Sequence, residues 1–160
     1  MAAEVIQGLY SYFTFRIGNE LFAVNIGHIT KILEMTDITK IPNSPRYFKG
    51  IINLFGEVLP VFDGRLKLGF PEVERTRNTC ILIFVFELDG QPVSSGIVVD
   101  SVEKVVIFDA EQIEPAPQNG EGFNSEYING IATINDESVI ILNLEKIFSE
   151  EEISLKNTVE

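Results

Sequence analysis

The chain has 160 residues, of which 45% are hydrophobic and 22% are charged, and its formal net charge is −12 at pH 7. These values are typical of one folded, water-soluble domain. The single cysteine, Cys80, excludes an internal disulfide, and the longest strongly apolar run, residues 80–86, is far too short to span a bilayer. The N-terminus lacks the pattern of a signal peptide, so we expect a cytoplasmic protein.

The negative charge is concentrated in the second half of the chain. Residues 13–63 contain five basic and five acidic side chains, whereas residues 84–145 contain one basic and twelve acidic side chains. An acidic surface repels phosphate backbones and attracts basic partners, which argues against nucleic-acid binding. Plain solubility explains the same charge equally well, and the charge alone does not choose between these two interpretations.

The first predicted element is a β-hairpin. Phe13, Phe15 and Ile17 alternate with polar residues, which is the period of a half-buried strand. The Gly-Asn pair at residues 18–19 then predicts a turn, and the apolar residues 21–24 predict the returning strand.

Further turns separate the apolar runs that follow. One helical turn is expected over residues 45–49, with a proline at its start and a glycine after its end. Gly56 marks the next turn. Residues 64–79 are the best linker candidate, because they combine glycine and proline with charges of both signs. Residues 80–86 are apolar at every position, which predicts a strand that is covered on both faces.

The end of the chain contains similar signals. The Asp-Gly pair at residues 89–90 predicts a hairpin turn, and the Asn-Asp pair at residues 135–136 predicts another. Residues 149–152, Ser-Glu-Glu-Glu, form a capping-box pattern. We therefore expect a short C-terminal helix over about residues 150–157.

The second half of the chain repeats the pattern of the first. Four segments recur in the same order: residues 13–19 as 84–90, 29–32 as 102–105, 41–45 as 114–117, and 50–63 as 130–143. A repeat of this size predicts one supersecondary unit that is built twice. Many short strands in two matching copies predict an all-β fold of two small β-barrels packed together. Two similar lobes must meet along a seam, and we expect partners to dock there.

Few side chains offer catalytic chemistry. His28 is the only histidine, which excludes a pair of histidine metal ligands, and a structural or surface role is expected for it. Cys80 lies among aliphatic and aromatic residues, where a cysteine is normally an inert core residue. Neither a phosphate-binding glycine-rich loop nor a nucleophile elbow occurs. The residues therefore predict a binding module with no catalytic, cofactor or metal site, and they do not identify what it binds.

A spaced pattern of proline, glycine and asparagine follows the first lobe's early strands. Its residues are Ile41-Pro42, Pro45, Tyr47, Gly50, Asn53-Leu54, Gly56, Pro60-Val61 and Asp63. This pattern resembles the CheW family, the chemotaxis coupling proteins of bacteria. The likeness continues through residues 96–100, 110–117 and 142–146 and covers about residues 11–157.

The resemblance implies a fold and a set of partners. The fold is all-β, with two pseudo-symmetric five-stranded SH3-like β-barrels around a shared hydrophobic core, short helical turns and one domain over residues 11–157. Lobe one is expected over about residues 13–68 and lobe two over about 80–147, with termini able to cross between the lobes. The family consists of non-catalytic adaptors that couple the cytoplasmic tip of methyl-accepting chemoreceptors to the regulatory domain of the histidine kinase CheA. The chain would then be recruited to membrane-associated receptor arrays, with no direct membrane insertion, no nucleic acid and no cofactor.

Candidate site residues follow from the positions of the motifs. In the family, the helical hairpin of the receptor lies in the groove between the barrels, which is helix-in-groove recognition. The residues expected in or near that groove are Ile29, Lys31, Phe55 and Val105. The residues expected to contact the kinase lie in barrel-end turns and are Gly56, Glu57, Asn135 and Asp136.

Three positions depart from the pattern of the family. The family usually has Arg at the position of Phe55, Glu at the position of Lys31 and Leu at the position of Gly64. An exposed Phe55 would be an apolar anchor for a partner, while neutral drift and packing onto its own barrel are equally open. Gly64 is expected to loosen the start of the linker. A second hypothesis stays open: a divergent regulatory or ligand-responsive module of a non-flagellar pathway that has lost the standard receptor contact.

Overall fold

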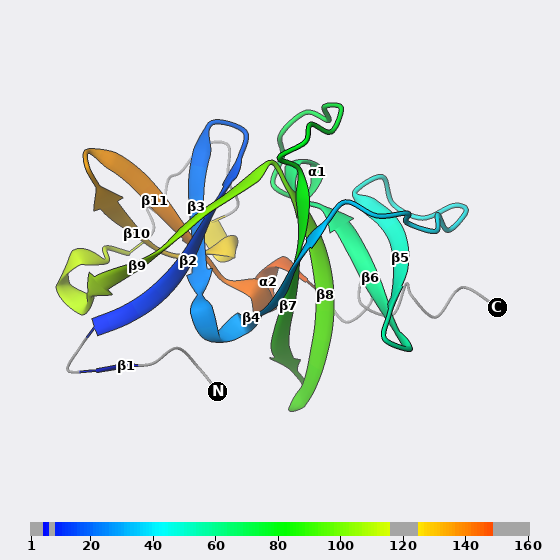
Figure 1. Cartoon of the computed structure of the whole chain (residues 1–160). Coiled ribbons are helices and arrows are strands. Elements are labelled where there is room, and N and C mark those ends of the chain that lie inside the picture. Colours follow the sequence, from blue (N-terminus) through cyan, green and yellow to red (C-terminus); the bar gives the residue numbers. More distant parts are fainter. Residues whose placement is uncertain (1–4, 7–8, 116–124, 149–160) are drawn as a thin grey trace.

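Two antiparallel-rich β-sheets lie side by side in the computed structural model, which describes residues 5–6, 9–115 and 125–148 (Figure 1). Sheet A contains β1 (Val5–Ile6), β2 (Leu9–Ile17), β3 (Glu20–Asn25), β9 (Ser101–Asp109), β10 (Ile128–Ile134) and β11 (Glu137–Leu142). Sheet B contains β4 (Ile29–Glu34), β5 (Phe48–Leu54), β6 (Glu57–Asp63), β7 (Cys80–Leu88) and β8 (Gln91–Val99). The helical elements are short: α1 (Gly64–Lys67), α2 (Leu144–Ile147) and 3₁₀ turns at Ile26–His28, Ala110–Gln112 and Ser125–Tyr127. The predicted all-β class is confirmed.

Each sheet mixes strands from both copies of the repeat. In sheet A, β3 pairs in parallel with β11, so that Leu21 lies opposite Val139. In sheet B, β8 pairs in parallel with β6, so that Gly96 lies opposite Val61. The first hairpin of each copy therefore joins the last hairpin of the other copy. The sheets thus differ from the expected division at residues 13–68 and 80–147, because alternation predicts strands but not their partners.

Each sheet closes into a barrel through an isolated bridge. The segment after β4 pairs with β5 through two hydrogen bonds between the backbones of Thr39 and Ile51, both 2.9 Å long. At the matching place in the second copy, Glu114 and Ile131 exchange two hydrogen bonds of 2.8 Å. We call the closed structures barrel A and barrel B after their sheets.

The expected helical turn over residues 45–49 is wrong. The amide of Phe48 donates to the carbonyl of Pro45 over 3.0 Å, which closes a β-turn, and β5 already begins at Phe48. Phe48 is buried and lies opposite Phe62 of β6. Burial of this aromatic pair favours the extended conformation over a helix end at Gly50.

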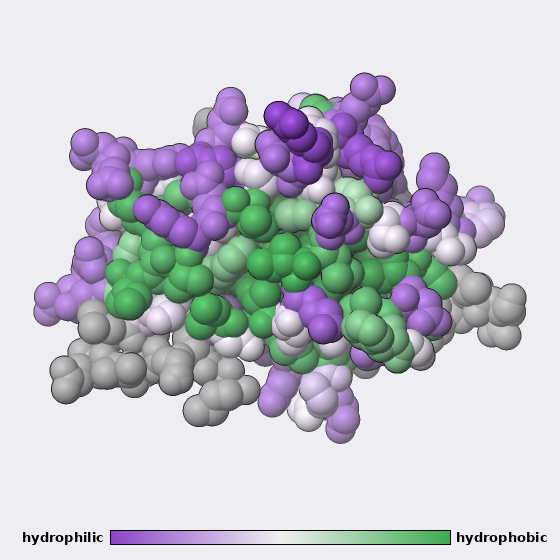
Figure 2. Space-filling model, viewed as in Figure 1, coloured by the Kyte–Doolittle hydropathy of each residue, from purple (hydrophilic) through white to green (hydrophobic). Residues whose placement is uncertain are grey.

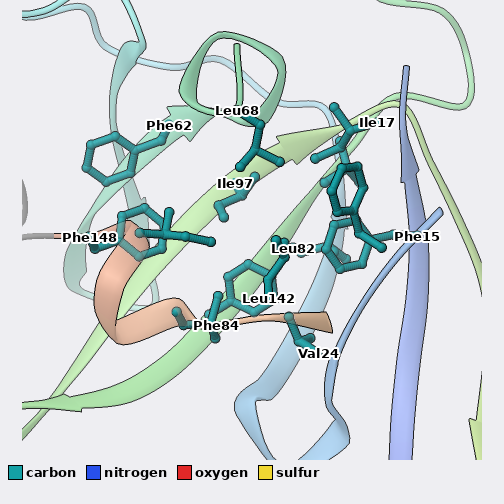
Figure 3. Close-up of a cluster of buried hydrophobic side chains, with 14 of the residues drawn as sticks. Phe15, Ile17, Val24, Phe62, Leu68, Leu82, Phe84, Ile97, Leu142 and Phe148 are labelled. Carbon is teal, nitrogen blue, oxygen red and sulfur yellow. The ribbon is translucent and has the colours of Figure 1, made fainter. Parts of the chain in front are cut away.

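The largest core lies between the barrels. Figure 3 shows buried side chains of both sheets pointing toward one another, including Phe15 of β2, Phe84 of β7 and Phe62 of β6. The rings of Phe15 and Phe84 lie 6.3 Å apart. Smaller clusters fill the interiors of the barrels, around Phe108 in barrel A and around Leu59 in barrel B. The predicted double cover of residues 80–86 is confirmed, because successive residues of β7 face the shared core and the interior of barrel B in turn.

The segment predicted as a linker begins with a packed helix. Asp63 caps α1 by accepting a hydrogen bond of 3.2 Å from the amide of Leu66, and Leu68 lies in the shared core. Gly64 does not loosen this segment: it is buried, and a Cβ there would lie 2.6 Å from the carbonyl oxygen of Val98. The missing side chain therefore allows α1 to pack closely against β8.

An ion pair ties α1 to barrel A. The guanidinium of Arg65 donates to both carboxylate oxygens of Asp100, at 2.9 to 3.2 Å, and Asp100 also accepts the amide of Gly18 at 2.7 Å. Asp100 thereby links the β2–β3 hairpin to α1, the helix that directly follows β6. The predicted C-terminal helix over residues 150–157 lies outside the described residues.

Arg16 joins three strands at the surface of barrel A. It donates to Glu137 of β11 over 2.7 and 2.9 Å and to Glu103 of β9 over 3.0 Å. The hydrogen bonds from Arg16 lower the pKa of Glu137 below its ordinary value and raise the pKa of Arg16. A carboxylate with a lowered pKa stabilises the folded state above its ordinary pKa, and this contribution is lost as the pH falls through the lowered value.

Replacement of Glu137 by Gln should therefore lower stability near neutral pH and lose its effect in acid. We expect the difference in free energy of unfolding between the wild type and Glu137→Gln to shrink between about pH 6 and pH 3. Urea denaturation at a series of pH values measures it. Glu87→Gln, at an exposed carboxylate outside this network, is the matched control. A difference that stays constant over this range would contradict the prediction.

Candidate interaction surface

Cys80 and His28, the two side chains with reactive chemistry, have structural roles. Burial raises the pKa of the Cys80 thiol, which keeps it from the thiolate form that reacts. The Nδ1 atom of His28 lies 2.9 Å from the carbonyl oxygen of Val85, and this hydrogen bond joins the turn before β4 to β7. Both side chains are thus accounted for by the packing and hydrogen bonding of the fold.

Exposed apolar side chains flank the seam between the barrels. In antiparallel strands, residues directly opposite each other point to the same face of the sheet. On β9, Val105 lies opposite Phe13 and Val102 lies opposite Phe15, whose side chains belong to the shared core. Val102 and Val105 therefore extend that core outward along β9, where they are 37% and 47% exposed.

The equivalent strand of the other barrel carries the same pattern. On β4, Ile29 lies opposite Phe84 and Ile32 lies opposite Leu82, and both partners belong to the shared core. Ile29 is half-buried against the core, and Ile32 is 48% exposed. We call Ile29, Ile32, Val102 and Val105 the seam band.

An open depression of about 680 Å³ lies between β4 and β9. Ile32 and Val102 both line it, together with residues 33–35 and 75–80, so one residue from each half of the seam band faces this hollow. Figure 2 shows apolar surface running across the face of the molecule on which β9 and β4 lie in front. Of the predicted receptor residues, Ile29 and Val105 belong to this band.

The other two predicted receptor residues contact each other. The ammonium nitrogen of Lys31 lies 5.2 Å from the centre of the Phe55 ring, which is a cation–π contact. Phe55 occupies the β5–β6 turn with φ of +52°, and its side chain is 88% exposed. Closure of barrel B brings Lys31 of β4 to this turn. Phe55 therefore does not fold back into its own barrel.

The predicted kinase residues divide into two turns. Gly56 and Glu57 belong to the β5–β6 turn, and Asn135 and Asp136 form the β10–β11 turn. Figure 1 places these turns at opposite ends of the molecule. They occupy equivalent positions in the two copies of the repeat, so the structure presents two similar ends and does not join the four residues in one site.

On β4 and β9, three exposed apolar residues were missed from the sequence. They are Ile32, Val102 and Ile107, and Ile107 is 62% exposed on β9. For β9, the sequence offered one signal of an exposed apolar surface: residues 105–108 are apolar without interruption, so apolar side chains lie on both faces of the strand. Such a run is also typical of a buried strand, which is why it did not identify a surface.

No helix within the described residues is long and apolar enough to cross a membrane. The chain matches the family of CheW-like domains over residues 11–152. It is 34% identical to the chemotaxis protein CheW of Klebsiella aerogenes over 159 residues, which cover 99% of this chain and 92% of that protein. It is also 34% identical to a probable chemotaxis protein CheW of Rhizobium etli, with 91% of this chain and 92% of that protein covered.

A solved structure has the same fold. The crystal structure of the scaffolding protein TtCheW from Thermoanaerobacter tengcongensis superposes with a TM-score of 0.79 at 30% identity. The match covers 89% of this chain and 94% of that one. The family model, the full-length similarity to chemotaxis proteins and the shared fold all agree. The chain therefore belongs to the CheW family of chemotaxis adaptors.

Proposed function

We propose that this chain is a non-catalytic adaptor that couples the cytoplasmic tip of methyl-accepting chemoreceptors to the regulatory domain of a CheA-type histidine kinase. The observation that carries the proposal is the seam band, which leaves apolar side chains of both barrels exposed, with Ile32 and Val102 at one depression. A monomeric protein gains nothing from this exposure, whereas a docking helix would bury it.

The shape of the seam band supports a helical occupant. The two strands that carry it, β4 and β9, are equivalent members of the repeat and approach the depression from opposite barrels. A helix laid between them would place apolar residues against Ile32 and Val102 together. Apolar anchors would supply most of the affinity, and polar residues at the rim would fix the register of the helix.

The two end turns support a separate contact with the kinase. Glu57 and the paired residues Asn135 and Asp136 lie at opposite ends of the molecule, away from the centre of the seam (Figure 1). Contacts at two ends would allow one chain to join two neighbouring kinase domains beneath a receptor array. Receptor and kinase would then bind to different surfaces of the adaptor.

The replacement Val105→Glu tests the receptor surface. We expect it to weaken binding of the receptor tip by at least about tenfold, because a carboxylate would be buried against an apolar helix. Binding of the kinase should not change. Titration calorimetry with each purified partner measures both constants. Val73→Glu is the matched control, since Val73 is 53% exposed but lies outside the seam band.

Co-purification from lysate decides between the two functional hypotheses. Recovery of a CheA-type kinase together with a chemoreceptor supports the adaptor. Recovery of the kinase alone supports the divergent module that has lost receptor contact. If neither partner is recovered at low salt, the proposed adaptor function is wrong.

A further inference from the structure

We infer that β9 of one chain pairs with β9 of a second copy, antiparallel and about a two-fold axis that passes between Glu103 and Lys104. The partner at this strand edge would be the chain itself. Three features of β9 support the pairing: an edge without a partner strand, four consecutive exposed residues, and a sequence that complements itself when it is reversed. The dimer goes beyond the proposed function, because it needs neither receptor nor kinase.

One edge of β9 has no partner strand. Along its length β9 pairs with β2, and within the described residues no second strand forms a ladder with it. The chain that follows β9 reaches β10 only through the bridge between Glu114 and Ile131. Unpaired backbone groups on an exposed edge are a template for a strand of another chain.

Four consecutive residues of β9 are exposed. They are Val102, Glu103, Lys104 and Val105. A strand of a barrel normally turns every second side chain into the interior, so an exposed run of this length is unusual. A partner strand at this edge can therefore contact apolar and charged side chains together.

A bulge accounts for the exposed run. Thr14 of β2 lies opposite both Glu103 and Lys104. The hydroxyl of Thr14 donates to the carbonyl of Lys104 over 2.6 Å and accepts from its amide over 3.1 Å. The backbone groups of Lys104 thus point toward β2, and those of Val105, the next residue, point to the free edge. A bulge normally hinders pairing with a straight strand. A two-fold axis at residues 103–104 sets the bulge against its own copy, so both strands bend at the same point.

The sequence Val-Glu-Lys-Val at residues 102–105 complements itself in antiparallel pairing. Val102 would lie opposite Val105 of the second copy, and Glu103 opposite Lys104 of the second copy. Residues directly opposite each other point to the same face, so valine meets valine and carboxylate meets ammonium. The axis repeats each pair. Lys104 takes part in none of the ion pairs among the described residues, whereas Glu103 also binds Arg16 at 3.0 Å.

The equivalent strand of barrel B lacks this self-complementarity. β4 carries Ile-Thr-Lys-Ile at residues 29–32, the repeat of residues 102–105, with a bulge at the same position. Reversed on itself, this segment sets Lys31 opposite Thr30, with no opposite charge. Pairing of β9 with β4 of a second copy would set Glu103 opposite Lys31, but it would leave a free edge at each end. Such a contact continues into a chain of copies, whereas β9 with β9 closes as a dimer.

The dimer is expected to be weak. A contact between two strand edges falls below the roughly 1,200 Å² of buried surface that stable interfaces have, and the net charge of −12 makes two copies repel each other. We expect a dissociation constant of about 100 µM. Val102 and Val105 also belong to the seam band, so the dimer would withhold them from the docking helix of the proposed function.

Sedimentation velocity of the full chain over a range of concentrations measures the dimer. Glu103→Lys and Lys104→Glu each turn both ion pairs into like-charge contacts, and each should weaken the dimer by at least about tenfold. An equimolar mixture of the two variants restores opposite charges at every pair, so mixed dimers should form with nearly the affinity of the wild type. Glu103→Lys makes the chain less negative, so a general charge effect would strengthen association instead.

Lys31→Glu is the matched control, because it changes the net charge as Lys104→Glu does, on the equivalent strand. It should leave the dimer unchanged. Weakening by Lys31→Glu, or growth beyond a dimer, would mean that β9 pairs with β4 and overturns the inference. A wild type that stays monomeric at about 1 mM also overturns it.

Folding of the variants is checked by their melting temperatures. Lys104→Glu should melt with the wild type, because Lys104 has no ion pair to lose, so an undiminished dimer in this variant overturns the register by itself. Two folded variants whose mixture stays monomeric overturn it as well. None of these results depends on receptor binding, so the adaptor function stands or fails separately.

Discussion

The replacement Gly50→Ala is expected to prevent stable folding. A Cβ at this position would lie 2.1 Å from the carbonyl oxygen of Thr39, and the φ angle of Gly50 is +140°. Backbone strain and overlap with a backbone atom add, and we expect a loss of more than about 4 kcal/mol in the free energy of unfolding. A loss of this size is a large part of the stability of a small protein. Thermal and urea denaturation measure it.

Gly90→Ala is the control for Gly50→Ala. Gly90 also has a positive φ, of +78°, but nothing lies within 4 Å of a Cβ built there. Its replacement should cost only about 1 kcal/mol, from the conformation alone. Equal losses in the two variants would show that the contact with Thr39, which closes barrel B, is unimportant.

The replacement Phe84→Ala should strongly damage the shared core. Phe84 is fully buried on β7, next to Phe15 of the other barrel. Removal of a buried ring leaves a cavity, and we expect a loss of about 3–5 kcal/mol. Because the cavity lies between the barrels, both should still unfold in one transition, at a lower urea concentration.

Phe55→Ala provides the comparison for Phe84→Ala. It removes the same number of atoms from a side chain that is 88% exposed, so stability should change by less than about 0.5 kcal/mol. Fluorescence and circular dichroism followed together during denaturation test the single transition. Separate transitions by the two probes would mean that the barrels unfold independently and that the shared core does not couple them.

The hairpins could be predicted from the sequence because their signals are local. Alternation in residues 13–17 and the turn at Gly18 correctly predicted β2 and β3, and the apolar residues 80–86 correctly predicted a doubly covered strand. The resemblance allowed the termini to cross between the lobes, but which strands the copies exchange could not be predicted. Because the two copies carry the same pattern, a hairpin could pair equally well with a strand of its own copy or of the other copy. Only long-range packing selects the partner strand.

The interaction surface was only partly predicted, because it too depends on contacts between residues far apart in the sequence. Motif positions identified Val105 and Phe55, both of which are exposed, but nothing in the sequence placed Lys31 over the Phe55 ring. That contact depends on closure of barrel B, which brings β4 to the β5–β6 turn. Ile32 was missed because an apolar residue in a strand is more often buried than exposed. Gly64 was misjudged because the close approach of Val98 is not visible in the sequence.

Because strands are exchanged between the copies, the two barrels are completed at different stages of synthesis. All five strands of barrel B lie between residues 29 and 99 and leave the ribosome as one continuous stretch, whereas the strands of sheet A begin with β1 and end with β11. Barrel B is thus an insertion within the sequence of barrel A. The first hairpin to be made must wait, with Leu21 and Ala23 uncovered, until the last strand arrives. The nascent chain is therefore exposed to aggregation and to chaperones through its earliest segment rather than its latest.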